Sequence, residues 1–447
     1  MTRPQIVFLL SLAGISVWTA FEAPSLFWLS LYALAVFVFT LAIGVRLVAA
    51  AASLAPAEPS AARWPAPLPR YTLICPLFLE ADVAHGLVAA LKRLDYPSEL
   101  LDVKLVLEED DIETRAALAA MALPAHFEIL VAPQGGPRTK PHALNHALSC
   151  ARGDFVAIYD AEDRPHPAQL KAALDAFAAD TQIACVQAPL AAENADQSWI
   201  AGQFAAEYAI QFRAMLPLLA RLKLPLPLGG TSNHFRVETL RAAGAWDPWN
   251  VTEDADLGYR LAREGWRSAM IAPPTQEEAP ITFDAWLKQR TRWIKGHMQT
   301  WLVLMRDPFA TAREMGVWAF LSMQLILFGG LIAAFAHGPL AIALALSILT
   351  PIDLLGPIDL GLASAGYATA LYLALAVAAL LRDERIALAA LTMPFYWPLA
   401  SLAALRALGE LFTRPHHWAK TEHGLAKRSL NGAISARTDA PRDKVAV

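Results

Sequence analysis

The 447-residue sequence has little charge, few cysteines and no excess of basic side chains. Only 17% of its residues are charged and 56% are hydrophobic, whereas about a quarter are charged in ordinary soluble domains. The formal net charge of −4, without a long basic stripe, excludes a nucleic acid as the expected partner. Cys75, Cys150 and Cys185 lack metal-ligand spacing and lie in apolar runs, so we expect core residues in a reducing compartment. The low charge indicates a chain that lies partly in a membrane.

Long apolar runs gather at the two ends of the chain. Residues 6–21 and 26–54 can each cross the hydrocarbon core, which takes about 20 apolar residues. A cleaved signal peptide is the alternative for the first run, but a longer apolar run follows at once, so two membrane helices are expected within residues 1–55. About four more are expected within residues 307–412, at 316–336, 339–355, 361–381 and 386–408.

Between these runs, residues 71–284 have ordinary polarity and follow a linker rich in proline and alanine at 56–70. The sequence therefore predicts a soluble domain inserted between membrane helices. Six spans would place the amino terminus, this domain and a basic tail at 413–447 on one side, which the positive-inside tendency identifies as the cytoplasm. The loop 382–385, with two arginines, would then lie on the opposite side, against that tendency.

Within residues 71–284, short apolar strands alternate with helical stretches such as 83–94 and 167–179. This alternation predicts a mostly parallel sheet with helices on both faces, and ligands bind such sheets outside the carboxyl ends of the strands. The strands are expected at 71–77, 102–108, 127–133, 154–160 and 183–190. The acidic residues at or just after their ends, which should gather on one rim, are Glu80, Glu108, Glu109, Asp110, Asp111, Asp160, Glu162 and Asp163.

Carboxylates held close together repel one another and persist with a divalent cation or a hydrogen-bonded ligand between them. The Gly- and Pro-rich loop 132–140 places Arg138 and Lys140 ahead of a helix start, which suits a phosphate-bearing ligand. Taken alone, an ordinary surface turn explains this loop better, and a solvated strand end explains residues 160–163. A helix start capped by Thr252 likewise explains residues 252–254.

These local explanations do not account for the occurrence of three short motifs, in a fixed order, along one such domain. The motifs are Asp160-Ala161-Glu162-Asp163, Thr252-Glu253-Asp254 and Gln289-Arg290-Thr291-Arg292-Trp293. In this conjunction the chain, from about residue 26 to 424, resembles the membrane-embedded family 2 glycosyltransferases, which include cellulose, hyaluronan and chitin synthases. Segments 137–148, 228–236 and 414–424 resemble bacterial biofilm exopolysaccharide synthases. Glu162, Leu79 and Thr291 depart from the residues usual in these motifs.

The resemblance implies an α/β GT-A fold, a Rossmann-like catalytic domain with a mostly parallel sheet, inserted between α-helical transmembrane segments of a bacterial inner membrane protein. It implies an inverting enzyme that builds a β-linked exopolysaccharide from a UDP-sugar, with Asp254 as general base. The implied ligands of a divalent cation, Mg²⁺ or Mn²⁺, are Asp160, Glu162 and Asp163. The implied donor-binding residues are Glu80, Asp110, Asp111, Arg138 and Lys140. The implied contacts to the acceptor or pyrophosphate are Glu253, Gln289, Arg292 and Trp293.

The segment 285–306 places three tryptophans and several basic residues just before the second apolar region. An amphipathic helix anchored in the headgroup layer by tryptophan and lysine explains this composition, and the same helix can also roof the active site. Two other functions stay open. One is transfer of a single sugar to a lipid such as a polyprenyl phosphate, and the other is a non-catalytic transporter or scaffold.

Overall fold

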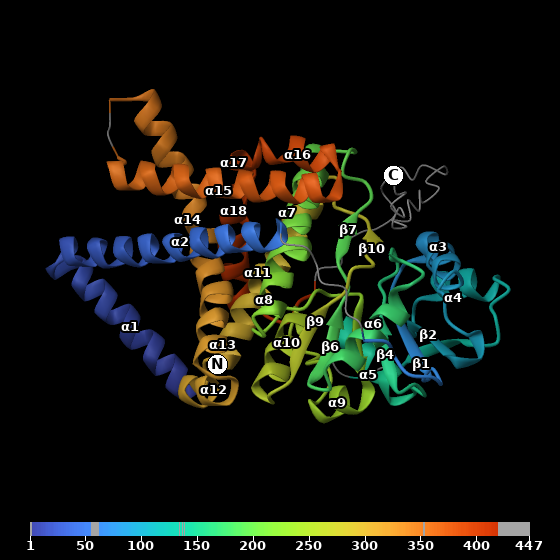
Figure 1. The fold of residues 1–447 in the computed structure, drawn as a ribbon. Coiled ribbons are helices and arrows are strands. Elements are labelled where there is room, and N and C mark those ends of the chain that lie inside the picture. Colours follow the sequence, from blue (N-terminus) through green and yellow to red (C-terminus); the bar gives the residue numbers. More distant parts are fainter. Residues whose placement is uncertain are drawn as a thin grey trace, which may run out of the picture.

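The computed structural model describes residues 2–54, 62–133, 135, 137, 139–351 and 354–418. The first part of the predicted linker 56–70 and most of the predicted tail 413–447 lie outside these residues. Figure 1 shows an α/β domain on one side and long helices on the other. The predicted architecture, a Rossmann-like domain between apolar helices, is confirmed.

The central sheet of the domain has seven strands in the order β3-β2-β1-β4-β8-β6-β9. They are β1 (Tyr71–Leu77), β2 (Leu101–Glu108), β3 (Phe127–Ala132), β4 (Phe155–Ile158), β6 (Ile183–Gln187), β8 (Asn233–Arg236) and β9 (Arg267–Met270). Only β8 runs antiparallel to its neighbours, β4 and β6, so the sheet is mostly parallel as predicted. A second sheet joins β5 (Arg164–Pro165), β10 (Thr275–Glu277) and β7 (Leu190–Ala192).

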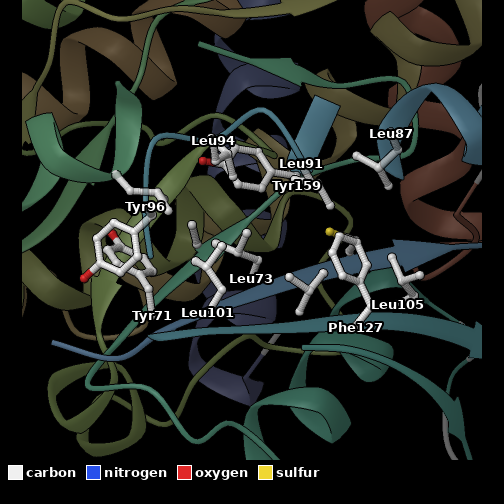
Figure 2. Packing of buried hydrophobic residues seen from close by; sticks show 14 of the residues in the cluster. Tyr71, Leu73, Leu87, Leu91, Leu94, Tyr96, Leu101, Leu105, Phe127 and Tyr159 are labelled. Atoms are coloured by element: carbon white, nitrogen blue, oxygen red, sulfur yellow. The ribbon is translucent and has the colours of Figure 1, made fainter. Parts of the chain in front are cut away.

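Helices cover both faces of the central sheet. They are α3 (Ala81–Leu91), α4 (Ile112–Ala119), α5 (Lys140–Ser149), α6 (Gln169–Ala179), α8 (Leu216–Arg221), α9 (Val237–Ala242) and α10 (Glu253–Arg263). The helix α7 (Trp199–Ile210) packs instead against β7 of the second sheet and against the apolar helices. Figure 2 shows one core layer, in which Leu87 and Leu91 of α3 lie over Leu73 of β1 and Leu105 of β2. Because alternate residues of a strand point to opposite faces, Ile74 and Val106 pack in the cluster on the other face. The carboxyl ends of β1, β2 and β4 therefore reach one rim.

Four helices of the described chain are long and apolar enough to cross a membrane. They are α1 (Arg3–Glu22), α2 (Pro24–Leu54), the run Val317–Leu349, and α15 (Pro357–Leu381). Within α2, the candidate span is Pro24–Ser53. The run Val317–Leu349 contains α13 (Val317–Met323), a π-helical turn η3 (Gln324–Phe328) and α14 (Gly329–Leu349). Figure 1 shows α2 and α15 side by side.

The structure differs from the expectation of separate spans at 316–336 and 339–355, which form one helical run. Pro339 lies inside α14 and cannot donate to the carbonyl one turn earlier. The Ser401 hydroxyl donates instead to the Ala334 carbonyl at 2.5 Å, and it accepts from the Gly338 amide at 2.8 Å. A neighbouring helix thus satisfies the freed backbone groups, and the helix continues through the proline.

The last apolar segment is also not a simple span. It consists of α16 (Glu384–Ala390), α17 (Met393–Tyr396) and α18 (Leu399–Thr413), with a bend of 61° between Glu384–Ala390 and Met393–Thr413. At its start, Trp199 of α7 donates to the Thr392 hydroxyl at 2.8 Å, and Gln203 donates to the Ala389 carbonyl at 2.7 Å. At its end, Glu410 pairs with Lys295 at 3.0 Å.

The segment therefore packs against α7 at its start and against Lys295 at its end. The loop 382–385 adjoins α16, and α16 packs against α7 of the α/β domain. Apolar length alone does not predict this packing.

The helix α11 (Phe283–Leu304) connects the domain to α12 (Pro308–Met315) and the membrane helices. It is enclosed by protein along much of its length. The Trp286 indole is buried and donates to the Tyr396 hydroxyl at 2.7 Å, and the Lys295 ammonium is buried beside Glu410. Trp286 and Lys295 are thus packing partners of the last apolar segment, in place of the expected anchors in a headgroup layer.

Candidate active site

A cavity of about 580 Å³ opens over the carboxyl ends of β1, β2 and β4 and extends to the membrane helices. Nine of the predicted site residues line it: Glu80, Lys140, Asp160, Glu162, Glu253, Asp254, Gln289, Arg292 and Trp293. Residues 100 to 200 positions apart in the sequence thus meet in one place. Asp110, Asp111 and Asp163 do not line the cavity, and Arg138 falls outside the described residues.

Asp111 has a structural position behind the rim. It is the N-cap of α4, where its carboxylate accepts from the Thr114 amide at 3.1 Å and from the Leu79 amide at 2.6 Å. These bonds join the end of β1 to the end of β2 and hold Leu79 at a positive φ of 54°. Asp111 thereby fixes the loop that carries Glu80 into the cavity.

The turn after β4 presents Asp160 and Glu162 to the cavity and folds Asp163 beneath them. Asp163 Oδ2 accepts from the Asp160 amide at 2.8 Å and from the Thr231 hydroxyl. Asp163 Oδ1 is buried without a hydrogen-bond partner. Burial, reinforced by the charges of Asp160 and Glu162, raises the pKa of Asp163 well above its usual value. This turn therefore concentrates negative charge that a cation would relieve.

Lys140, at the start of α5, supplies a positive charge next to this turn. Its ammonium pairs with Asp160 and donates to the Gly230 carbonyl at 2.7 Å. Burial lowers the pKa of Lys140, but the charges of Asp160, Glu253 and Asp254 outweigh burial and raise it. Lys140 is therefore a permanent cation between the two acidic motifs.

The second acidic motif begins α10. Asp254 Oδ1 accepts from the Ala255 amide at 2.8 Å, and Oδ2 faces Gly230, whose added Cβ would lie 3.3 Å from it. Burial raises the pKa of Asp254, and burial together with Asp254 raises the pKa of Glu253 to about 7. A pair of carboxylates whose pKa values are both raised by burial in a cavity is suited to proton transfer.

Thr252 occupies the N-cap position of α10 but makes no side-chain capping bond, contrary to the local explanation from sequence. Its side chain packs against Gly296 of α11, where an added Cβ would collide with it. Gly296 therefore allows α11 to approach the start of α10 closely, and this contact sets the position of Asp254 relative to the cavity face of α11.

That face of α11 carries a charged and aromatic clamp. The Arg290 guanidinium donates to both oxygens of Glu207 at 2.8 and 2.5 Å, and the Tyr396 hydroxyl donates to Glu207 at 3.0 Å. Arg290 also lies 4.9 Å from the ring centroid of Trp293, which stacks on Tyr208 at 6.1 Å with an interplanar angle of 18°. The Trp293 ring is thus fixed from two sides at the cavity wall.

The described end of the chain closes one side of the cavity. The Lys295 ammonium donates to the His417 carbonyl at 2.9 Å, and Gln299 donates to the Pro415 carbonyl at 3.0 Å. These bonds bring the Trp418 ring over the Arg292 guanidinium, 5.4 Å from the ring centroid. Trp418 lines the cavity although the sequence assigned it no role.

Several other cavity residues were not predicted from the sequence. They are Glu207, Tyr208, Glu277, Glu278, Arg290 and His297. An acidic residue within the apolar run of α7 was the available signal for Glu207, since an unpaired charge is rarely buried. Arg290 stood inside a quoted motif, whereas the other positions depend on how α7, β10 and α11 pack together.

Residues 69–296, more than half of the chain, match the family described as "Glycosyltransferase like family 2". The chain belongs to this family. The prediction of a glycosyltransferase is confirmed at this level.

The curated relatives include the beta-monoglucosyldiacylglycerol synthase of Synechocystis sp., which is 27% identical over 272 residues, 58% of this chain and 55% of the relative. The probable glycosyltransferase YdaM of Bacillus subtilis is 23% identical over 251 residues, 55% of this chain and 60% of the relative. The chain thus spans little more than half the length of the relatives it matches. These relatives do not confirm the predicted similarity to cellulose and hyaluronan synthases.

Among solved structures, the mannosyltransferase PcManGT from Pyrobaculum calidifontis, in complex with GDP-Man and Mn²⁺, has a TM-score of 0.54 at 21% identity. The similarity covers 86% of this chain and 99% of that protein. At this identity the likeness concerns the fold, and it confirms the GT-A-type domain with flanking helices.

Proposed function

We propose that this protein is an inverting glycosyltransferase that moves a sugar from a nucleotide diphosphate to an acceptor reaching the site from the membrane. One observation carries the proposal. A single cavity joins the carboxylates of Asp160 and Glu162 to apolar side chains of the membrane helices, including Ile326 and Leu331. A soluble acceptor would not require that continuity.

In the proposed reaction the acceptor oxygen bonds to the anomeric carbon as the bond from that carbon to the diphosphate oxygen breaks. The Asp254 carboxylate takes the proton of the attacking hydroxyl, and its raised pKa makes it a stronger base than an exposed aspartate. One displacement inverts the anomeric centre and gives a β-linkage from an α-linked donor. Lys140 and Arg292 contribute positive charge where the diphosphate departs.

A divalent cation fits the site as part of this proposal. No group of three or more His, Cys, Asp or Glu side chains that could hold a metal occurs in the part of the chain that the structure describes. Mg²⁺ commonly takes only one or two carboxylates and completes its shell with water and substrate phosphates. Asp160 and Glu162 would hold the ion, with Asp163 Oδ1 buried behind them. The bound ion would neutralise the leaving diphosphate, and Mn²⁺ in the archaeal mannosyltransferase supports this assignment.

The membrane end of the cavity favours a lipid acceptor. Ile326, Leu331, Ala334 and Ala400 line it, and apolar side chains suit acyl or prenyl chains better than a hydrated glycan. The name of the cyanobacterial relative, a glucosyldiacylglycerol synthase, supports the same reading. Single-sugar transfer to a lipid is therefore the first candidate.

Synthesis of a β-linked exopolysaccharide is the second candidate. Trp293, stacked on Tyr208, and Trp418 place aromatic faces on the cavity wall, and aromatic rings are suitable platforms for sugars. This is the finer function that the resemblance to biofilm polysaccharide synthases implies.

For the arrangement in the membrane, we propose four spans: α1, α2, the run Val317–Leu349, and α15. The α/β domain, α11 and the segment from α16 to the tail would lie on one side, where the donor nucleotide is found. In a bacterium this is the cytoplasmic side of the inner membrane.

The deciding experiment uses the full chain, purified in detergent and returned to lipid. Radiolabelled UDP-glucose, UDP-N-acetylglucosamine and GDP-mannose are each incubated with it, and label is separated into an organic-soluble fraction and a high-molecular-weight fraction. Label in the organic phase supports a lipid acceptor, and label in polymer that a β-glycosidase releases supports the second candidate. The proposal would be refuted if the protein transferred sugar from none of these donors, or if the Asp254→Asn variant transferred sugar as fast as the wild-type protein.

A further inference from the structure

His297 lies where the polar part of the cavity gives way to the apolar part. It follows Trp293 by one turn of α11 and lines the same cavity. Its neighbours Ile294 and Met298 pack with Leu331, Ala334 and Ala400 of the membrane helices. A lipid whose chains occupy the apolar end would therefore present its headgroup beside His297.

The ring nitrogens of His297 are available to a ligand. The side chain makes no hydrogen bond to any other described residue. Burial, and the nearby charge of Arg290, lower the pKa of His297 to about 4. At neutral pH its ring is uncharged and offers one N–H donor and one nitrogen acceptor. That pair matches a hydroxyl group, which also donates once and accepts.

The charges around His297 disfavour an anionic headgroup. Among the described residues, three basic side chains line the cavity against nine acidic ones. Arg290, on the cavity face of α11, donates two hydrogen bonds to the Glu207 carboxylate and is paired with it. Glu277 and Glu278 add further acidic groups to the wall. A lipid phosphate would meet a wall on which acidic side chains outnumber basic ones, whereas an uncharged alcohol would not be repelled by them.

We propose that His297 hydrogen-bonds the headgroup of the acceptor, and that this acceptor is an uncharged lipid alcohol in preference to a lipid phosphate. The inference rests on the proposed function and defines its acceptor class. It assigns His297 as a positioning residue on the acceptor side, separate from the donor contacts at the strand ends.

The first test compares two acceptors in the same nanodiscs. Full-length protein receives a radiolabelled donor with either 1,2-dioleoylglycerol or undecaprenyl phosphate, and the labelled lipids are separated by charge. The expected result is label in the uncharged lipid, with at least tenfold less in the phosphate. Equal or greater label in undecaprenyl phosphate would overturn the inference on acceptor class while leaving the proposed function intact.

The second test separates a positioning role from a packing role. His297→Leu should raise the acceptor KM by roughly tenfold, because one hydrogen bond is lost, and should leave the affinity for the nucleoside diphosphate unchanged. His297→Gln keeps a donor and an acceptor and should restore most of the KM. The matched control, His85→Leu, changes an exposed histidine of α3 outside the cavity.

Equal acceptor KM values for the wild-type protein and His297→Leu would show that His297 does not bind the acceptor headgroup. If His297→Leu fails to fold, the glutamine variant and the acceptor comparison still decide the question. If the wild-type protein did not bind any nucleotide-sugar donor, that result would instead count against the proposed function.

Discussion

The contact between Gly296 and Thr252 provides a sharp test of how α11 positions the catalytic carboxylate. An added Cβ at Gly296 would collide with the side chain of Thr252, directly before Glu253 and Asp254. We expect Gly296→Ala to push α11 away from the start of α10. Asp254 belongs to α10 and the acceptor wall belongs to α11, so the substitution changes the distance between base and acceptor without touching either.

The size of the effect follows from the packing. Inserting one methyl group into a close contact costs about 1–3 kcal/mol, which is tolerable for a folded domain. A displacement of about 1 Å at the reacting groups lowers turnover about 100-fold. Donor affinity should change little, since Glu80, Lys140 and Asp160 come from the strand ends and α5. The signature is therefore a large fall in kcat with modest changes in stability and donor affinity.

The assay measures sugar transfer, donor affinity by titration and the thermal unfolding midpoint on the same detergent-purified samples. Gly409→Ala is the matched control, because this exposed glycine of α18 has nothing within 4 Å of an added Cβ. Alanine there should keep activity and improve helix stability by about 0.5–1 kcal/mol. Native turnover in Gly296→Ala would show that the contact between α10 and α11 does not set the catalytic geometry.

Three further predictions concern the chemistry and the membrane arrangement. Asp254→Asn should lower turnover by at least about 1,000-fold while nucleotide binding persists, as measured by kinetics and titration; comparable losses of both would make Asp254 a donor ligand. Because the pKa of Glu253 is raised to about 7 and that of Asp254 is also raised, the pair gains a proton as pH falls through neutrality. Turnover should therefore decline on the acid side of about pH 7 in a pH–rate profile, and a flat profile from pH 5 to 8 would contradict a carboxylate base. In a cysteine-free variant, single cysteines in the loop 382–385 and at residues 414–418 should react with an impermeant reagent from the same side, and opposite sides would restore a complete span between them.

The sheet could be predicted from sequence where its strands are long and apolar. Residues 71–77 and 102–108 are short, mainly apolar segments, and their parallel pairing follows from the helix between them. The strand β8, Asn233–Arg236, could not be predicted in this way. It has four residues, three of them polar, and its antiparallel place between β4 and β6 depends on residues far along the chain.

The site was predictable to the extent that its residues end strands or begin helices. Asp160 follows β4 and Asp254 begins α10, so local structure alone points both toward the rim. Asp111 obeys the same rule, yet its carboxylate is used to cap α4 and to hold the end of β1. Sequence position gives the end of an element, whereas the direction of a side chain depends on the hydrogen bonds available in the folded domain.

The membrane segments show most clearly what composition can and cannot decide. Hydropathy measures length and apolarity, so it assigned separate spans around Pro339 and a complete span at 386–408. The structure instead continues one helix through Pro339 with help from Ser401, and returns the last segment to the catalytic side through Trp199 and Glu410. With the four spans proposed above, the amino terminus and residues 414–418 would lie on one side of the membrane. The two arginines of loop 382–385 would then lie on the side of the α/β domain, in agreement with the positive-inside tendency, which six spans would violate.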